Sequence, residues 1–329
     1  MTSDNDGLTL PEPLAEPASP AVVIPVYEPY YWPKQKHSLR SLLIAIGLFF
    51  VTTLSVLSAG VQFAAAYAAG HQPALEDFAI SYFQPFAQPR LLLLGIPFAI
   101  TLMGILLAHE LGHYFACRHY HIHATYPFFI PAPTIIGTLG AFIRIRSPII
   151  NRRALFDVAI AGPLVGFLVA VPALALAIAK SKFIAPGSEE SLVTFGRPLV
   201  EQLLEAILQP GVPPATLLLH PIGRAAWVGI FATALNLLPA GQLDGGHILY
   251  SVASQRHRLV TLAVAILLVP LAIHYWLGWL MWAVLLLAIG FRHPPLMDRW
   301  EPLDHRRRLG AWLALAIFIL CFMPAPITI

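Results

Sequence analysis

Charged side chains are scarce in this chain of 329 residues, because Asp, Glu, Lys and Arg together make up 11% of it and 57% of the residues are hydrophobic. Soluble globular proteins carry about 25% charged and about 45–50% apolar residues. The shortage of charge therefore predicts a membrane protein. The formal net charge of +3 is too small to indicate a nucleic-acid partner, and we expect none.

Cysteine is nearly absent too, and basic residues are absent from the first 33 positions. Cys117 and Cys321 lie far apart in or beside apolar segments, which predicts neither a disulfide framework nor a cysteine-based metal site. A secretory signal begins with basic residues and a transit peptide is rich in arginine. We therefore expect residues 1–38, rich in proline, to be a disordered cytoplasmic tail, and the membrane to be the bacterial cytoplasmic membrane.

Apolar runs of about 20 residues, long enough to cross a bilayer, fill much of residues 39–329. They predict an all-α polytopic membrane protein with six or seven transmembrane helices. The expected spans are 41–66, 90–117, 154–179, 223–240, 259–275, 276–291 and 309–325, with a further short or re-entrant segment at 240–256. The fifth and sixth spans can alternatively form one hairpin of short helices.

Basic residues predict the orientation, since they favour the cytoplasmic side of a membrane. With the N-terminus inside and seven spans, 15 of the 20 Lys and Arg residues lie on the cytoplasmic side. The cytoplasmic loop 119–153 alternates apolar pieces with proline and glycine, which predicts a membrane-associated β-hairpin. The extracytoplasmic loop 181–222 is about 42 residues long, too short for a separate recognition domain of typical size.

The predicted second span contains the pattern HELGH at residues 109–113. His109 and His113 share one face of a helix, so both imidazoles can bind one metal ion. Glu110 can accept a proton from a metal-activated water. Such polar groups are costly inside a membrane unless they are paired or functional, although a polar cluster that bonds neighbouring helices remains an alternative.

Asp244 is the best candidate for a third ligand. It is a conspicuous acid in an apolar region, and Pro239, Gly241 and the glycines at 245–246 interrupt the helix around it. Irregular backbone at membrane depth is tolerated where it is buried in protein or lines a wet cavity. The alternative is an ordinary helix end followed by a turn.

The chain resembles the site-2 proteases, a family of intramembrane zinc metalloproteases, over roughly residues 90–258. The matching motifs are HELGH at 109–113, AGPLVG at 161–166 and NLLPAGQLDGGH at 236–247. Residues 127–148 look closest to a plastid and bacterial branch of that family. The resemblance implies one catalytic Zn²⁺ bound by His109, His113 and Asp244. It further implies Glu110 as the catalytic base and Asn236 as a contact to the substrate or the reacting carbonyl.

This reading predicts a zinc endopeptidase that cleaves membrane-anchored protein substrates within the lipid bilayer, in regulated proteolysis. His113 lies five residues before Arg118, about 7–8 Å along a helix, which predicts a site in the cytoplasmic half of the membrane. A helical substrate must unwind locally before its carbonyl is exposed. The predicted hairpin could then offer an edge strand to it.

Two other functions stay open: a non-catalytic protein that binds membrane clients, and a metal transporter. Further histidines also have two readings each. His119, His121 and His123 could form a second metal site or a solvated interfacial cluster. His247 could orient Asp244 or be a simple interfacial histidine. The sequence leaves the oligomeric state undetermined.

Overall fold

The computed structural model describes residues 39–72, 82–183, 194–212, 217–289, 293, 296 and 302–328. The expected disordered tail at 1–38 lies outside these residues. So do parts of the loop 181–222, including Glu189 and Glu190.

Each predicted span corresponds to a helix. In chain order these helices are α1 (Leu39–Ala69), α4 (Ile96–His119) with the preceding 3₁₀ segment η1 (Pro89–Gly95), α5 (Arg152–Lys180), α7 (Pro221–Asn236), α9 (His257–His274), α10 (Gly278–Ile289) and α11 (His305–Cys321). The shorter helices are α3 (Gln84–Ala87), α6 (Leu199–Leu208) and α8 (Asp244–Ala253). The expected re-entrant region thus contains α8.

Four helical segments of the described chain are long and apolar enough to cross a membrane: Leu39–Ala69, Pro89–His119, Arg152–Lys180 and His257–His274. Helices α7, α10 and α11 have 16, 12 and 17 residues. A transmembrane helix has roughly 17–25 residues, so α7 and α10 are shorter than this range and α11 lies at its lower limit. The count of six or seven spans therefore stays a prediction.

Large hydrophobic side chains point outward along the long helices. Phe50 on α1 and Leu267 and Ile273 on α9 are exposed by more than half. Contiguous exposed apolar surface of this kind marks a lipid or protein interface. Exposed hydrophobic side chains of this kind are expected of a polytopic membrane protein, in which lipid chains cover the outer faces of the helices.

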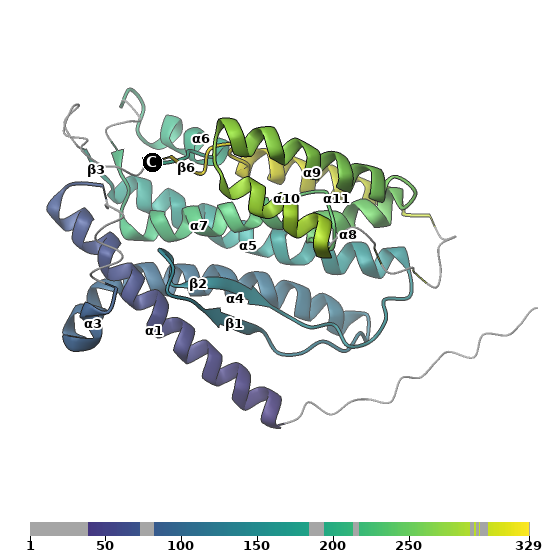
Figure 1. Ribbon diagram of the computed structural model, residues 1–329, viewed down its shortest axis with the longest axis horizontal. Coiled ribbons are helices and arrows are strands. Elements are labelled where there is room, and N and C mark those ends of the chain that lie inside the picture. Colours follow the sequence, from purple (N-terminus) through teal and green to yellow (C-terminus); the bar gives the residue numbers. More distant parts are fainter. Residues whose placement is uncertain are drawn as a thin grey trace, which may run out of the picture. The chain divides into compact units, whose positions relative to one another are not determined.

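Helices α4, α5 and α7 pack side by side (Figure 1). Small residues allow the close approach. A Cβ at Gly112 of α4 would lie 2.6 Å from the Ala161 carbonyl oxygen of α5, and one at Gly229 of α7 would lie 2.7 Å from Ile105 of α4. Only glycine fits at such contacts. Helices α4 and α5 are therefore held in close contact on the faces that carry Gly112 and Ala161.

Strands β1 (Phe128–Pro131) and β2 (Thr138–Phe142) form an antiparallel pair in which Phe128 lies opposite Phe142. The turn between them contains Gly137 at φ 79°, a backbone conformation that favours glycine. A Cβ there would lie 2.6 Å from the Ser55 carbonyl oxygen of α1, so the hairpin packs tightly on α1. Its association with the membrane stays a prediction.

Two further short strand pairs lie at the other end of the helices. Strand β3 (Lys182–Phe183) pairs with β5 (Leu217–Leu218), and β4 (Thr194–Phe195) pairs with β6 (Ile327–Thr328). The second pair joins the loop after α5 to the C-terminal segment. Helix α6, between these strands in sequence, is therefore fixed against the helices.

Candidate metal centre

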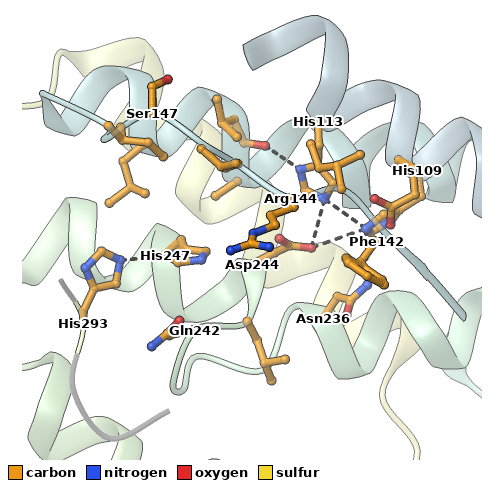
Figure 2. A pocket seen from close by; sticks show the side chains of 18 of the residues that line it. His109, His113, Phe142, Arg144, Ser147, Asn236, Gln242, Asp244, His247 and His293 are labelled. Carbon is orange, nitrogen blue, oxygen red and sulfur yellow. Dashed lines mark hydrogen bonds and ion pairs between the residues drawn. The ribbon is translucent and has the colours of Figure 1, made fainter. Parts of the chain in front are cut away.

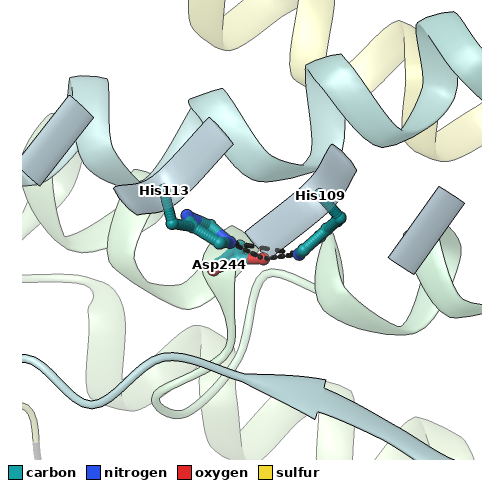
Figure 3. Close-up of side chains that lie close together, drawn as sticks. All are labelled: His109, His113 and Asp244. Carbon is teal, nitrogen blue, oxygen red and sulfur yellow. Dashed lines mark hydrogen bonds and ion pairs between the residues drawn. The ribbon is translucent and has the colours of Figure 1, made fainter. Parts of the chain in front are cut away.

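Helix α4 carries His109, Glu110 and His113, and all three are buried. The two imidazole rings are neighbours on one face of the helix, with centroids 4.8 Å apart. Both rings point toward the carboxylate of Asp244 (Figure 3). The structure thus brings together the three ligands that were predicted from separate motifs.

The three ligand atoms have the spacing of a zinc site. The Nε2 atoms of His109 and His113 are 3.1 Å apart, and Asp244 Oδ2 lies 3.4 Å from each. Tetrahedral zinc binds nitrogen and oxygen at about 2.0–2.2 Å, which places neighbouring ligand atoms roughly 3.3–3.5 Å apart. Within the described parts of the chain, these residues are the only such group that could hold a metal ion.

His113 is oriented by helix α5. Its Nδ1 lies 2.8 Å from the Val158 carbonyl oxygen. A carbonyl only accepts, so Nδ1 carries the proton and donates it. The Nε2 lone pair is then directed at the metal position, as in metal sites where a second hydrogen bond fixes the histidine tautomer.

The AGPLVG motif makes room for both imidazoles. A Cβ at Gly162 would lie 2.1 Å from His113 Nε2, and one at Gly166 would lie 3.2 Å from His109 Nδ1. These glycines are four residues apart and share one face of α5. The sequence analysis identified these glycines only as part of a family motif, and their fit against the imidazoles becomes visible only in the packing of α5 on α4.

Asp244 is the first residue of α8 and is held there by a tight turn after α7. Gly241 adopts φ 63°. A Cβ at Gly245 would lie 2.1 Å from the Leu237 carbonyl oxygen, so glycine alone allows α8 to start against that turn. Helix α9 secures the turn, since Thr261 Oγ1 accepts from Gly241 N–H at 3.1 Å and His257 Nε2 lies 3.0 Å from Gly241 O.

Glu110 and Asn236 flank the three ligands. The Glu110 carboxylate interacts with both histidines and accepts a hydrogen bond from the Ile143 backbone N–H. Asn236, the last residue of α7, places Nδ2 3.3 Å from His109 Nε2. A carboxylate and an amide donor therefore stand beside the metal position, as general-base and oxyanion chemistry requires.

A cleft of about 600 Å³ opens over the centre. One wall is the end of β2 and the extended segment after it, where Phe142, Arg144 and Ser147 line the cleft, and another wall is the turn at Gln242 (Figure 2). The backbone of the extended segment pairs with another strand-like segment along one of its two long edges. Its backbone groups at Arg144 and Arg146 bond to the segment 123–125.

Ile145 lies opposite Ala124 as an isolated antiparallel bridge. The two ladder hydrogen bonds on either side come from Thr125 and Arg146, so this is a non-hydrogen-bonded pair whose own N–H and C=O groups point to the opposite edges. The outer edge of this segment therefore presents the Ile143 and Ile145 backbone groups on the side where Glu110 lies.

The other histidines divide into two groups. His119, His121 and His123 are not among the residues whose ligand atoms converge in the described chain, and their role stays a prediction. His247 Nδ1 lies 2.8 Å from His293 Nε2, and both rings line the cleft (Figure 2). The sequence gave no signal for His293, which lies after α10.

Comparisons with known proteins find a peptidase family over the part of the chain that contains His109, His113 and Asp244. A family model described as Peptidase family M50 matches residues 97–277, more than half of the chain. The probable zinc metalloprotease EGY1 of Arabidopsis thaliana, a chloroplastic protein, is 32% identical over 178 residues, which cover 52% of this chain and 32% of that protein. The probable chloroplastic zinc metalloprotease EGY2 of Oryza sativa subsp. indica is 33% identical over 204 residues, covering 59% of this chain and 36% of that protein. The chain spans about a third of the length of these relatives.

Proposed function

The chain belongs to peptidase family M50, and we propose that it is an intramembrane zinc endopeptidase that hydrolyses membrane-anchored protein substrates in regulated proteolysis. The predicted resemblance to the site-2 proteases is confirmed by this membership. One observation carries the proposal: the two histidines and Asp244 match a zinc site in spacing, with Glu110 directly beside them.

The chain's own residues account for the proton movements. A zinc ion held by His109, His113 and Asp244 would supply Lewis acidity for the attacking water and the scissile carbonyl. Glu110 takes the proton of the attacking water and passes it to the leaving amine. The Ile143 N–H holds the Glu110 carboxylate toward the centre, and the Asn236 amide donates to the developing oxyanion.

The edge at Ile143 and Ile145 is suited to an unwound substrate. A helical substrate has its carbonyls bonded internally, so the scissile segment must become extended before it reacts. An extended segment can add as a further strand through the Ile145 N–H and C=O groups, while the Ile143 N–H stays bonded to Glu110. The cleft beside this edge also contains the metal ligands, which supports delivery of the scissile carbonyl to them.

We further propose that the N-terminus is cytoplasmic, on the basis of the distribution of the 20 Lys and Arg residues. The expected bacterial cytoplasmic membrane stays a prediction, because the relatives above are named as chloroplastic proteins. Lipid and membrane-anchored proteins are the proposed partners.

The deciding experiment is cleavage of a panel of single-span substrates by purified protein in detergent, with zinc content measured on every sample. Wild type is compared with Glu110→Gln, which removes the base but none of the three ligands. We expect both proteins to bind zinc and only the wild type to cleave. Zinc binding without cleavage by either protein would favour the client-binding function, and a wild type that binds no zinc would refute the proposal.

A further inference from the structure

Helix α6 (Leu199–Leu208) is amphipathic, but its polarity is opposite to that of a helix on a water-exposed surface. Leu199, Leu203 and Ile207 are 44%, 54% and 73% exposed. They recur every four residues and so form one outward stripe. The acids of the same helix, Glu201 and Glu205, are 3% and 8% exposed and face inward.

The inward acids are held by arginines from two neighbouring segments. Arg197 forms an ion pair with Glu205. Arg224, buried at the start of α7, interacts electrostatically with Glu201 and lies 4.4 Å over the Phe195 ring. A buried charge such as that of Glu205 requires a partner of this kind, and the Arg197–Glu205 ion pair together with the burial of Glu201 fixes the rotation of α6 with the aliphatic stripe outward.

The inner face of α6 is also packed against two helices. Val200 and Leu204 join the cluster that contains Leu174 and Ile178 of α5 and Ile317 of α11. Helix α6 lies beside these helices at the end where β6 and the C-terminus are found (Figure 1). The stripe therefore belongs to a rigid surface and is not a loosely attached loop.

The helices on which α6 packs also carry exposed apolar side chains. On α5, Leu168 and Leu176 are exposed, and on α11 Leu315 and Ile319 are exposed. These are the helices on which α6 packs. Since α5 is long and apolar enough to cross a membrane, lipid chains that cover its outer face reach the neighbouring stripe of α6.

We infer that α6 is an interfacial helix whose face of Leu199, Leu203 and Ile207 is buried among lipid acyl chains, in the leaflet at the Lys180 end of α5. Amphipathic helices bind bilayers in this way, with the apolar face at the boundary between headgroups and acyl chains. Helix α6 then acts as a membrane anchor between α5 and α7. The inference does not depend on peptidase activity.

Site-directed spin labelling tests this placement in the full chain, reconstituted in phosphatidylcholine–phosphatidylglycerol vesicles. Leu203→Cys and Ile207→Cys carry a nitroxide, and collisions with oxygen, which partitions into lipid, are compared with collisions with a water-soluble nickel chelate. Leu168→Cys on α5 is the lipid control. His71→Cys, an exposed polar position just after α1, is the aqueous control, and wild type gives the background because Cys117 and Cys321 are buried.

We expect positions 203 and 207 to match position 168, with high oxygen and low nickel accessibility, and position 71 to show the reverse. Nickel accessibility at 203 and 207 equal to that at 71 would overturn the inference. Loss of access for both reagents would also overturn it, because it would mean that protein covers the stripe. Zinc content and elution volume confirm that each variant is folded.

Discussion

Replacing Gly162 by alanine should weaken zinc binding although alanine is the better helix former. Alanine stabilises a helix interior by roughly 1 kcal/mol relative to glycine, a gain that Pro163 at the next position of α5 reduces. The added Cβ, however, would lie 2.1 Å from His113 Nε2 and 2.5 Å from two other ring atoms. An ordinary contact begins at 3.4 Å, so the ring must retreat by about 1.3 Å.

The ring has no free direction for that retreat. Its Nδ1 is bonded to the Val158 carbonyl at 2.8 Å, one helical turn before Gly162. Metal–ligand distances tolerate deviations of only about 0.2 Å. Loss of a hydrogen-bond partner of a metal ligand costs roughly 10–100-fold in metal affinity. Displacement of a ligand itself should cost at least about 100-fold, which corresponds to about 2.7 kcal/mol of binding free energy.

Two matched substitutions form a graded series. At Gly166 the Cβ would lie 3.2 Å from His109 Nδ1, so a shift of about 0.2 Å suffices, and we expect a loss of about tenfold or less. At Gly104 of α4 no atom lies within 4 Å, and zinc affinity should be unchanged. Competition with a chromophoric chelator gives the affinities, and circular dichroism checks the helix content. Wild-type zinc affinity in a folded Gly162→Ala protein would refute the argument.

Three further predictions follow from other parts of the structure. Asp244→Ala should lower zinc affinity by more than about 100-fold because it removes a predicted ligand. The control Asp304→Asn, at the N-cap of α11, should leave zinc affinity unchanged. The same chelator competition measures both variants. Ile145→Pro should abolish cleavage at unchanged zinc content because it removes an edge N–H that no ladder hydrogen bond uses. The control Ile145→Val keeps that N–H and should cleave normally. Equal cleavage rates of the two variants would exclude strand addition at this edge. Burial, with the neighbouring Glu205, raises the pKa of Glu201 to about 8. The folded protein therefore binds a proton that the unfolded chain releases near the ordinary pKa of 4.5. The free energy of unfolding should fall as pH rises from about 5 to 8, by up to about 1.4 kcal/mol per pH unit. Thermal unfolding of Glu201→Gln in detergent should lose this dependence, and an unchanged slope would contradict the assignment.

The sequence predicted the helices well and selected three residues that the structure brings together, for physical reasons that are visible in particular residues. Apolar runs marked the positions of α1, α4, α5 and α9 because length and hydropathy are local properties. His109 and His113 were assigned to one face because their spacing matches a helical turn. Asp244 could be selected because an acid is rare in such an apolar region.

Other features could not be predicted because they depend on contacts between distant segments. The fit of Gly166 against His109 requires the packing of α5 on α4. Glu201 and Glu205 were expected in an extracytoplasmic loop, where acids usually face water, but Arg224 and Arg197 draw them inward. His293 lies in the cleft beside His247, a residue 46 positions away in the sequence.

The ligands of the metal centre are separated along the chain, and this has a consequence for when activity can begin. His109 and His113 are made early, but Asp244 follows more than a hundred residues later, after α5 and α7. Its position further depends on α9, which secures the turn at Gly241. A nascent chain that has inserted only its first helices therefore carries two of the three predicted metal ligands. The proposed peptidase activity cannot begin until Asp244, α8 and α9 have joined them.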